Sequence, residues 1–356
     1  MHVNTCEILC CPTCRGTVEP VGFARGFLEE GALICRSCHT EYPVRAGIPI
    51  FIGANLSVDS TGDGFSEMNE EIRQKVLQRE WHDRERLDRE YKRAAYGSQT
   101  LFSFVLYYQM REAFPLLATG KTSLVANICA GHGFELEFLS KFSGSIVAID
   151  ISWNSLRLAL ERARELGLKV EAICADAENL PLRDNSFDLV FTHQSLHHLP
   201  RPLRGLEEML RTSRRRVACF EPAKGVTRTV LTALGIKPAV EESGNFVYEF
   251  DLRSVEKVSS KQNVRLQHFR KCLITGLADE PDWFHRMDSL HLTPLLRGAV
   301  TFANRLVGNL LGTKCTVILE KDSRGPAAIP FSSVSPTGAG ILETSHYAQE
   351  VQPAKH

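Results

Sequence analysis

Two pairs of cysteines near the N-terminus have the types and spacing of metal ligands. Cys11 and Cys14 form one C-x2-C pair, and Cys35 and Cys38 form a second pair after an interval of twenty residues. The two-residue gap lets both thiolates of a pair reach one ion, and four thiolates match the tetrahedral coordination of Zn²⁺. Because four thiolates leave no open position, we predict a structural zinc ion that helps a small module to fold.

The remaining cysteines of this region leave an alternative. Six of the 11 cysteines fall within the first 38 residues, and Cys6, Cys10 and His39 lie beside the two pairs without sharing their symmetry. Such a cluster indicates metal rather than disulfides in a reducing compartment. Four buried or reactive thiols without a metal ion are the other interpretation.

Polar residues at three successive strand ends point to a small-molecule site. One apolar run contains Asn127 and leads into Gly131 and Gly133, and the next two runs end in Asp150 and Asp176. Glycines at a strand-to-helix turn let a ligand approach the backbone, and a carboxylate such as Asp150 can accept both hydroxyls of a ribose. Each acid alone could cap a helix or solvate a strand end, but three polar groups in register favour one cofactor site.

The glycine pattern argues against hydride chemistry. Dinucleotide folds use G-x-G-x-x-G, and Leu136 stands where the third glycine would fall.

Histidines follow the fourth strand-like run, at the edge where a second substrate would lie. His193 and His197 are candidates to remove or orient a hydroxyl proton, because an imidazole titrates near neutral pH. Glu221, at the end of the fifth run, is a candidate of the same kind. The alternative is that the histidines only orient their loop.

The elements that must position these residues alternate between apolar runs and amphipathic helical patterns, which is typical of a sheet covered by helices on both faces. We predict strands at 123–128, 145–149, 169–174, 187–192, 216–221, 264–273 and 315–320, with helices at 135–142, 155–166 and 203–212.

Composition divides the chain into four parts. We predict a small module at 1–55, a linker with a helical connector or lid at 56–112, an α/β domain at 113–322 and a disordered tail at 323–356. The connector carries i,i+4 pairs such as Glu71 and Lys75, and we interpret it as solvated with one face against the next domain; a protein-binding arm is the alternative. Apolar residues at helical spacing within 276–312 predict a stripe that packs in the core or in a lid. The alternative is that this stripe contacts a hydrophobic acceptor or a membrane surface.

Charge and hydropathy limit the function classes. The chain has 42 Lys+Arg against 42 Asp+Glu, so a purely electrostatic nucleic-acid binder is disfavoured. The N-terminus does not show a basic region followed by an apolar region, as a leader peptide would, and the sequence has no run of about 18 apolar residues. We expect a cytoplasmic protein without a transmembrane segment.

The cysteine region resembles the zinc-ribbon family of tRNA-methyltransferase activator subunits. The resemblance rests on Cys11-Pro-Thr-Cys14-Arg-Gly and on Tyr42-Pro-Val followed by Gly47-Ile-Pro. That family serves as a partner or accessory module for methyltransferases, which implies a protein partner at the ribbon.

Residues 120–222 resemble the class I S-adenosylmethionine-dependent methyltransferases, most closely the small-molecule type that includes ubiquinone and menaquinone enzymes. The resemblance implies an α/β fold with a Rossmann-like, doubly wound, seven-stranded sheet. It places the Gly131/Gly133 loop under the methionine part of the cofactor and the ribose on Asp150. It further implies contacts of the cofactor with Asn127, Ile151, Asp176 and Ala177, the last two at the exocyclic amine of adenine. The family usually has an acid in place of Asn127 and a glycine in place of Cys129.

The sequence therefore predicts a methyltransferase that uses S-adenosylmethionine and acts at oxygen or carbon of a small or lipid-like acceptor. An RNA-modifying methyltransferase with the ribbon as substrate reader is one alternative. A non-catalytic cofactor-binding scaffold that pairs with another protein is the second. An enclosed apolar pocket favours the small acceptor.

Overall fold

The computed structural model describes residues 1–22, 26–53, 56–57, 59–61, 65–84, 95–120, 122–235, 240, 246–273 and 281–321. The predicted tail at 323–356 lies outside the described residues, as does the predicted connector between 85 and 94.

A seven-stranded mixed sheet forms the centre of the molecule. Its strand order is β10-β11-β9-β8-β5-β6-β7, and β11 is antiparallel to both of its neighbours, whereas β7, β6, β5, β8 and β9 are parallel. The strands are β5 (Val125–Ile128), β6 (Ile146–Asp150), β7 (Val170–Cys174), β8 (Phe187–His193), β9 (Ser213–Pro222), β10 (Arg265–Cys272) and β11 (Lys314–Glu320). The predicted Rossmann-like, doubly wound sheet is confirmed, and each strand falls within a few residues of its predicted range.

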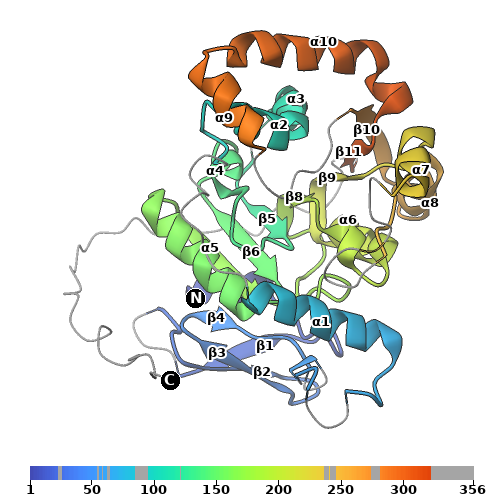
Figure 1. The fold of residues 1–356 in the computed structure, drawn as a ribbon. Coiled ribbons are helices and arrows are strands. Elements are labelled where there is room, and N and C mark those ends of the chain that lie inside the picture. Colours follow the sequence, from blue (N-terminus) through green and yellow to red (C-terminus); the bar gives the residue numbers. More distant parts are fainter. Residues whose placement is uncertain are drawn as a thin grey trace, which may run out of the picture.

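The strands read as continuous apolar runs because both faces of the sheet are buried. Val125 and Phe191 pack into one hydrophobic cluster, while their neighbours Ala126 and Val190 pack into another on the opposite face. This alternation follows from the two-residue period of a strand. The side chains of the sheet therefore contact two separate layers, and Figure 1 shows helices on either side of the sheet.

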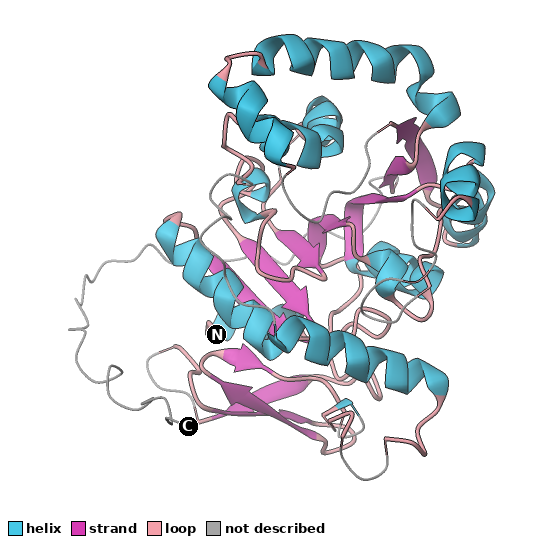
Figure 2. Ribbon diagram, in the orientation of Figure 1, coloured by secondary structure: helices cyan, strands magenta, loops and turns pink. Residues whose placement is uncertain are grey.

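Helices cover both faces (Figure 2). The first cluster includes residues of α3 (Tyr108–Leu117), α4 (Leu136–Leu139) and α5 (Trp153–Glu165). The second includes residues of α6 (Pro202–Thr212) and α8 (Leu252–Lys261), together with the N-terminal module.

The N-terminal module is a small antiparallel sheet of four strands in the order β1-β2-β3-β4. These strands are β1 (Val18–Val21), β2 (Gly31–Cys35), β3 (Glu41–Arg45) and β4 (Ile48–Pro49), after a 3-10 turn at Val3–Ile8. The predicted small, β-rich module is confirmed, and we refer to residues 1–53 as the ribbon.

The ribbon is paired to the large sheet through the backbone. Leu9 and Leu182 form an antiparallel bridge, and the N–H of Cys10 donates to the carbonyl of Pro181 at 2.9 Å. At the sheet edge, the N–H of Phe51 donates to the carbonyl of Cys174 at 2.8 Å. Since ribbon side chains also share one hydrophobic cluster with the sheet, the two parts have a common core.

Five further helices surround this frame: α1 (Glu70–Arg84), α2 (Leu101–Leu106), α7 (Val226–Ala233), α9 (Asp282–Ser289) and α10 (Thr293–Leu311). In Figure 1, α1 lies between the ribbon and the large sheet, beside α5, and α10 lies at the opposite end above α2 and α3. Within the described residues, no helix is both long and apolar enough to cross a membrane.

The apolar stripe predicted to pack as core or lid is only partly buried. Leu296 and Val300 contact α2 and its neighbours, but Leu295, Phe302 and Leu306 are 71%, 68% and 72% exposed. The core prediction is therefore wrong for these three residues, because α10 turns a different side toward the protein.

We expect the ribbon and the sheet to unfold together, because they share one core. Leu9→Ala removes a fully buried side chain at the junction, so the unfolding free energy of the whole chain should fall by about 2–5 kcal/mol. Urea unfolding followed by tryptophan fluorescence and circular dichroism measures this change. Val21→Ala, at a 53% exposed ribbon position, is the control and should change stability by less than about 0.5 kcal/mol. Two separate transitions, with only one moved by Leu9→Ala, would contradict the shared core.

Candidate functional site

The four predicted cysteine ligands converge. The sulfur atoms of Cys11, Cys14, Cys35 and Cys38 all lie within 4.8 Å of one another. The Cys11–Cys38 and Cys14–Cys35 sulfur distances are 3.5 and 3.4 Å. A tetrahedral zinc ion with Zn–S bonds of about 2.3 Å needs sulfurs separated by about 3.8 Å, so the cluster is close to that geometry.

Neighbouring groups favour the thiolate form of Cys38. The hydroxyl of Thr40 lies 3.2 Å from the sulfur of Cys38, and hydrogen bonds from Thr40 lower the pKa of Cys38 to about 6. A Cβ at Gly16 would lie 2.6 Å from the side-chain oxygen of Ser37, so glycine allows the close turn after Cys14. The cluster can therefore hold a closed structural ion, while Cys6, Cys10 and His39 stand outside it.

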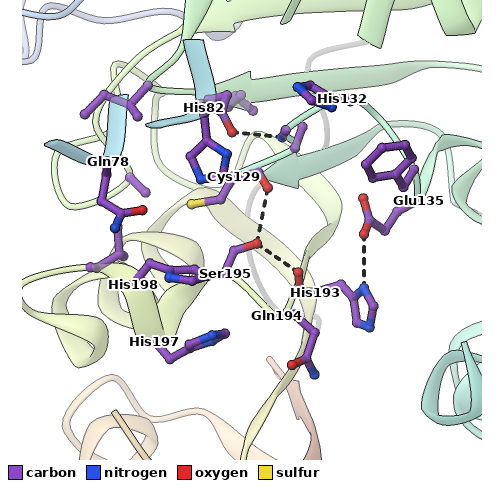
Figure 3. Close-up of a pocket in the computed structure, with 18 of the residues that line it drawn as sticks. Gln78, His82, Cys129, His132, Glu135, His193, Gln194, Ser195, His197 and His198 are labelled. Carbon is purple, nitrogen blue, oxygen red and sulfur yellow. Dashed lines mark hydrogen bonds and ion pairs between the residues drawn. The ribbon is translucent and has the colours of Figure 1, made fainter. Parts of the chain in front are cut away.

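A cavity of about 510 Å³ lies at the carboxyl edge of the parallel strands. Its walls come from the ends of β6 and β8 and the loops after β5, β6, β7 and β8, from α1 on one side and from α2, α3 and the start of β11 on another (Figure 3). Parallel sheets bind ligands at this edge because the loops of several strands meet there. The cavity also falls within the usual size range of small-molecule sites.

Asp150 is fixed as an acceptor at the centre of one wall. Its two carboxylate oxygens accept hydrogen bonds from the N–H groups of Gly131 and Ser152, both at 2.8 Å, and the residue is 6% exposed. A Cβ built on Gly131 would meet nothing within 4 Å. The strand-end acid and the glycine turn are thus joined beside open space that a ligand can fill.

Cys129 occupies a strained position on the same wall. Its φ of 53° lies in the left-handed region, which is costly for a residue with a Cβ. Burial, followed by nearby carboxylates such as Asp150, raises the pKa of this thiol well above its ordinary value. Cys129 therefore lines the cavity as a neutral thiol.

An ion pair with Lys75 of α1 holds Asp176 in place. Its Oδ2 lies 2.6 Å from Nζ of Lys75, which also contacts Glu178 at 2.8 Å, and its Oδ1 accepts from the N–H of Glu178 at 2.9 Å. The predicted pair between Lys75 and Glu71 is not formed, because Lys75 turns toward the cavity.

The connector helix α1 is a wall of the site. Lys75, Gln78 and His82 line the cavity, and Val76 is fully buried. One face of the predicted connector thus packs on the α/β region, as expected, but that face also carries polar side chains that line the cavity. The helix has few apolar residues, so its sequence did not indicate how deeply this face is buried.

The other predicted cofactor residues divide into two groups. Ile151 and Ala177 line the cavity next to Asp150 and Asp176. Asn127 and Gly133 do not: Asn127 is 1% exposed, its buried side-chain nitrogen has no hydrogen-bond partner among the described residues, and Gly133 packs against α5. A Cβ at Gly133 would lie 3.0 Å from that of Ala159, so this glycine serves helix packing.

His193 forms a pair with a residue that the sequence did not indicate. Its Nδ1 lies 3.0 Å from Oε1 of Glu135, and both side chains line the cavity. The ring of Tyr107 lies against His193 with 6.0 Å between centroids.

His197 and Glu221 form the second pair. Nδ1 of His197 lies 2.6 Å from Oε2 of Glu221, which also accepts from the backbone N–H of His197, while Oε1 accepts from the N–H groups of Ser195 and Leu196. Burial by itself would raise the pKa of Glu221, but the hydrogen bond and charge of His197 and the backbone donors lower it below its ordinary value. His197 lines the cavity, whereas Glu221 is fully buried behind it and does not.

A positively charged side chain lies at the same end of the cavity as the His197–Glu221 pair. Lys314, 7% exposed at the start of β11, donates to the side-chain oxygen of Gln194. Gln194 is itself fixed, since its amide nitrogen donates to the carbonyl of Phe220 at 3.2 Å and its φ is 54°. Gln109 of α3 completes this wall.

Sequence reasoning missed Lys75, Glu135, Gln194 and Lys314. Glu135 and Gln194 are close in sequence to the predicted residues Gly133 and His193, and this closeness could have indicated them. Lys75 and Lys314 are 101 and 120 residues from the partners that they contact, and no local pattern connects them.

Comparison with known proteins finds two family matches, each to a limited segment of the chain. Residues 126–220 match the methyltransferase domain family, and residues 3–47 match the family of Trm112p-like proteins. These matches confirm the two resemblances drawn from the sequence.

The curated relatives are methyltransferases that align only in part. The demethylmenaquinone methyltransferase of Listeria welshimeri is 29% identical over 132 residues, or 35% of this chain and 56% of that protein. Phosphoethanolamine N-methyltransferase 1 of Arabidopsis thaliana is 35% identical over 103 residues, or 29% of this chain and 19% of that protein. The chain thus spans about half the length, or less, of these relatives.

Two solved structures are similar over most of this chain. Magnesium protoporphyrin IX methyltransferase from Synechocystis, with bound SAH, is 14% identical with a TM-score of 0.46, over 70% of this chain and 100% of that one. A complex of the Haloferax volcanii Trm112 methyltransferase activator with a methyltransferase gives 12% identity and a TM-score of 0.43, over 61% of this chain and 90% of that one.

The cysteine cluster predicts about one zinc ion per chain. Cys14→Ser should abolish zinc binding and lower the thermal stability of the whole chain, because the ribbon is part of the common core. Elemental analysis of protein prepared with zinc supplied measures the first effect, and thermal unfolding measures the second. Cys6→Ser is the control and should retain zinc. A wild-type protein without zinc would refute the site.

Proposed function

We propose that this chain, with its methyltransferase domain and Trm112p-like ribbon, is a methyltransferase that uses S-adenosylmethionine to methylate oxygen or carbon of a small or lipid-like acceptor. The observation that carries the proposal is one cavity with cofactor-type acceptors, Asp150 and Asp176, on one wall and His197, backed by the buried Glu221, on another.

The residues of the first wall fit the adenosine part of the cofactor. Asp150, held by two N–H groups, keeps lone pairs on both oxygens for the ribose hydroxyls. Asp176 and Ala177 would contact the adenine amine, and Ile151 would flank the ring. When bound, S-adenosylmethionine supplies an already activated methyl group, so the protein mainly has to align the acceptor and exclude water.

The second wall fits proton removal from the acceptor. With Nδ1 of His197 directed at Glu221, the neutral imidazole carries its lone pair on Nε2. Glu221 is ionised at neutral pH and stabilises the imidazolium that forms when His197 takes a proton. We therefore assign Glu221 a positioning role behind His197, instead of the direct catalytic role considered from the sequence. His193, paired with Glu135, is the second candidate base.

The walls around the acceptor end favour a small, partly apolar molecule. Leu106, Tyr107 and Leu199 contribute apolar surface, and Lys314 contributes a positive charge that can stabilise an oxyanion formed on the acceptor.

The ribbon fits the role of an accessory module for its own chain. Arg15 donates to the carbonyl of Leu180 at 2.6 Å and lies 3.5 Å from Glu208, and Arg183 donates to the carbonyl of Leu9. Arg15 of the ribbon and Arg183 of the α/β domain thus fix the ribbon on its own chain.

The acceptor can be identified by an untargeted labelling experiment. Labelled S-adenosylmethionine is incubated with separate metabolite, lipid and RNA fractions, and the fraction that acquires label is identified. Label in RNA would support the alternative function, and binding without any label would support the non-catalytic scaffold.

The cofactor wall predicts the effect of Asp150→Ala. Loss of the double acceptor should weaken S-adenosylmethionine binding more than tenfold, or by at least about 1.4 kcal/mol, as measured by calorimetry. Asp184→Ala is the control, because Asp184 is exposed and does not line the cavity. Equal affinity of wild type and Asp150→Ala would show that the cofactor lies elsewhere.

The histidine wall predicts a pH signature. His197→Ala should lower the single-turnover rate by roughly 10²-fold or more at neutral pH, with cofactor affinity nearly intact. Glu221→Gln removes the charge that favours the imidazolium, so the pKa of His197 should fall and the rising limb of the rate should move to lower pH. A His197→Ala variant with the wild-type rate and pH profile would remove His197 from the mechanism.

A further inference from the structure

Helix α10 buries polar residues and exposes apolar ones. Thr293, Asn304 and Gly308 are its buried residues, and the amide oxygen of Asn304 accepts from the N–H of Leu273 at 2.7 Å. On the opposite side, Phe302 and Leu306 are 68% and 72% exposed. An ordinary surface helix has the reverse pattern, with its apolar stripe toward the core.

The exposed side chains form one stripe along the helix. Leu295, Phe302, Leu306 and Leu310 follow intervals of seven, four and four residues, which keep them on one face. The helix has 19 residues and is therefore about 28 Å long. An apolar ridge of this length is typical of a surface that contacts another apolar phase.

Helix α7, whose start lies next to the end of α10, carries a second exposed stripe. Val226, Val230 and Leu234 are 78%, 48% and 66% exposed at intervals of four residues. A Cβ at Gly225, the N-cap of α7, would lie 3.7 Å from the carbonyl oxygen of Gly312, the C-cap of α10. The ends of the two helices therefore adjoin.

The segments that carry these stripes contain no carboxylate. Residues 225–235 and 292–312, which span α7 and α10 with their caps, hold no Asp or Glu, whereas 32 residues at the overall frequency of 42 acids in 356 would hold about four. Cations are present instead: Arg305 is exposed on α10, and Lys224 and Lys271 lie at the junction with α7, where Nζ of Lys271 is 3.5 Å from the carbonyl of Lys224. This charge pattern complements an anionic surface.

We propose that the exposed stripes of α7 and α10 are a docking surface for an anionic lipid membrane. Leu, Phe and Val side chains enter the boundary between headgroups and acyl chains, and the lysines and arginine contact lipid phosphates. The absence of acids in these two segments and the length of the exposed apolar ridge favour a membrane over a protein partner.

The position of α10 connects this surface to the cavity. Leu296 and Val300, on the inner side of α10, pack near Phe104 and Val105 of α2. The next residue of α2, Leu106, lines the cavity. This inference rests on the proposed function. Docking here brings a lipid-derived acceptor to the side of the protein where methyl transfer would occur.

The test is co-sedimentation of the full chain with vesicles, and it requires neither acceptor nor methyl transfer. Wild type should bind vesicles of phosphatidylcholine and phosphatidylglycerol in equal parts at least tenfold more strongly than pure phosphatidylcholine. Phe302→Gln with Leu306→Gln should reduce this binding at least tenfold, and Val226→Gln alone should reduce it several-fold. Arg305→Glu should weaken binding only to the anionic vesicles.

Matched controls keep the outcome clear. Leu166→Gln changes a 43% exposed leucine after α5, away from α7 and α10, and should bind vesicles as wild type does. All substituted positions are exposed, so the variants should fold, which circular dichroism verifies. No binding to anionic vesicles, or binding unchanged in the double variant, would overturn the proposal. So would a wild-type dimer that the double variant converts to monomer without a change in vesicle binding, because a second copy would then cover the face.

Discussion

The segment from Cys174 to Arg183, which leaves β7 and leads to β8, is the constraint on which both parts of the molecule depend. One side of it pairs with the ribbon, through Phe51 at Cys174 and Leu9 at Leu182. Its other side presents Asp176 and Ala177 to the cavity. The cysteine cluster therefore acts on the site at a distance, because it holds the ribbon that fixes this segment. Because the ribbon belongs to the same chain, it needs no association step. The geometry of the segment therefore does not depend on the concentration of a partner.

Three carboxylates with little access to water, the buried Asp150 and Glu221 and the partly buried Asp176, account for the order of the cavity walls. An ionised acid out of water is tolerated only when donors compensate the lost hydration. Asp150 receives two backbone N–H groups, Glu221 receives backbone donors and His197, and Asp176 receives Lys75. Such donors also fix the orientation of each acid before a ligand arrives, which is the condition for electrostatic preorganisation. The position of α1 follows from the same need, since Lys75 satisfies two acids at once.

The end of the molecule opposite the ribbon has a different physical character. There the sheet is extended by β11 and β10, and α10 packs on β10 with polar contacts while Leu295, Leu306 and Leu310 face outward. Exposed apolar surface is unfavourable in water and is lowered in free energy by any apolar phase that covers it. A membrane at this end and a cysteine-supported ribbon at the other would leave the cavity between them, with α1 on one of its walls.

The sequence by itself determined the elements and the residues that short-range patterns encode. The strand ranges, the doubly wound sheet and the four cysteines could be predicted because hydrophobic periodicity and C-x2-C spacing are local. Asp150, Asp176, His193 and His197 could be predicted as neighbours because parallel strands end at one edge. Only the tertiary structure decided that Lys75 contacts Asp176, that Lys314 reaches Gln194 and that Asn127 is buried outside the cavity. It also decided which side of α10 faces the protein. These contacts depend on packing between segments about a hundred or more residues apart, or on the orientation of a helix against its neighbours, and neither leaves a periodic trace in the chain.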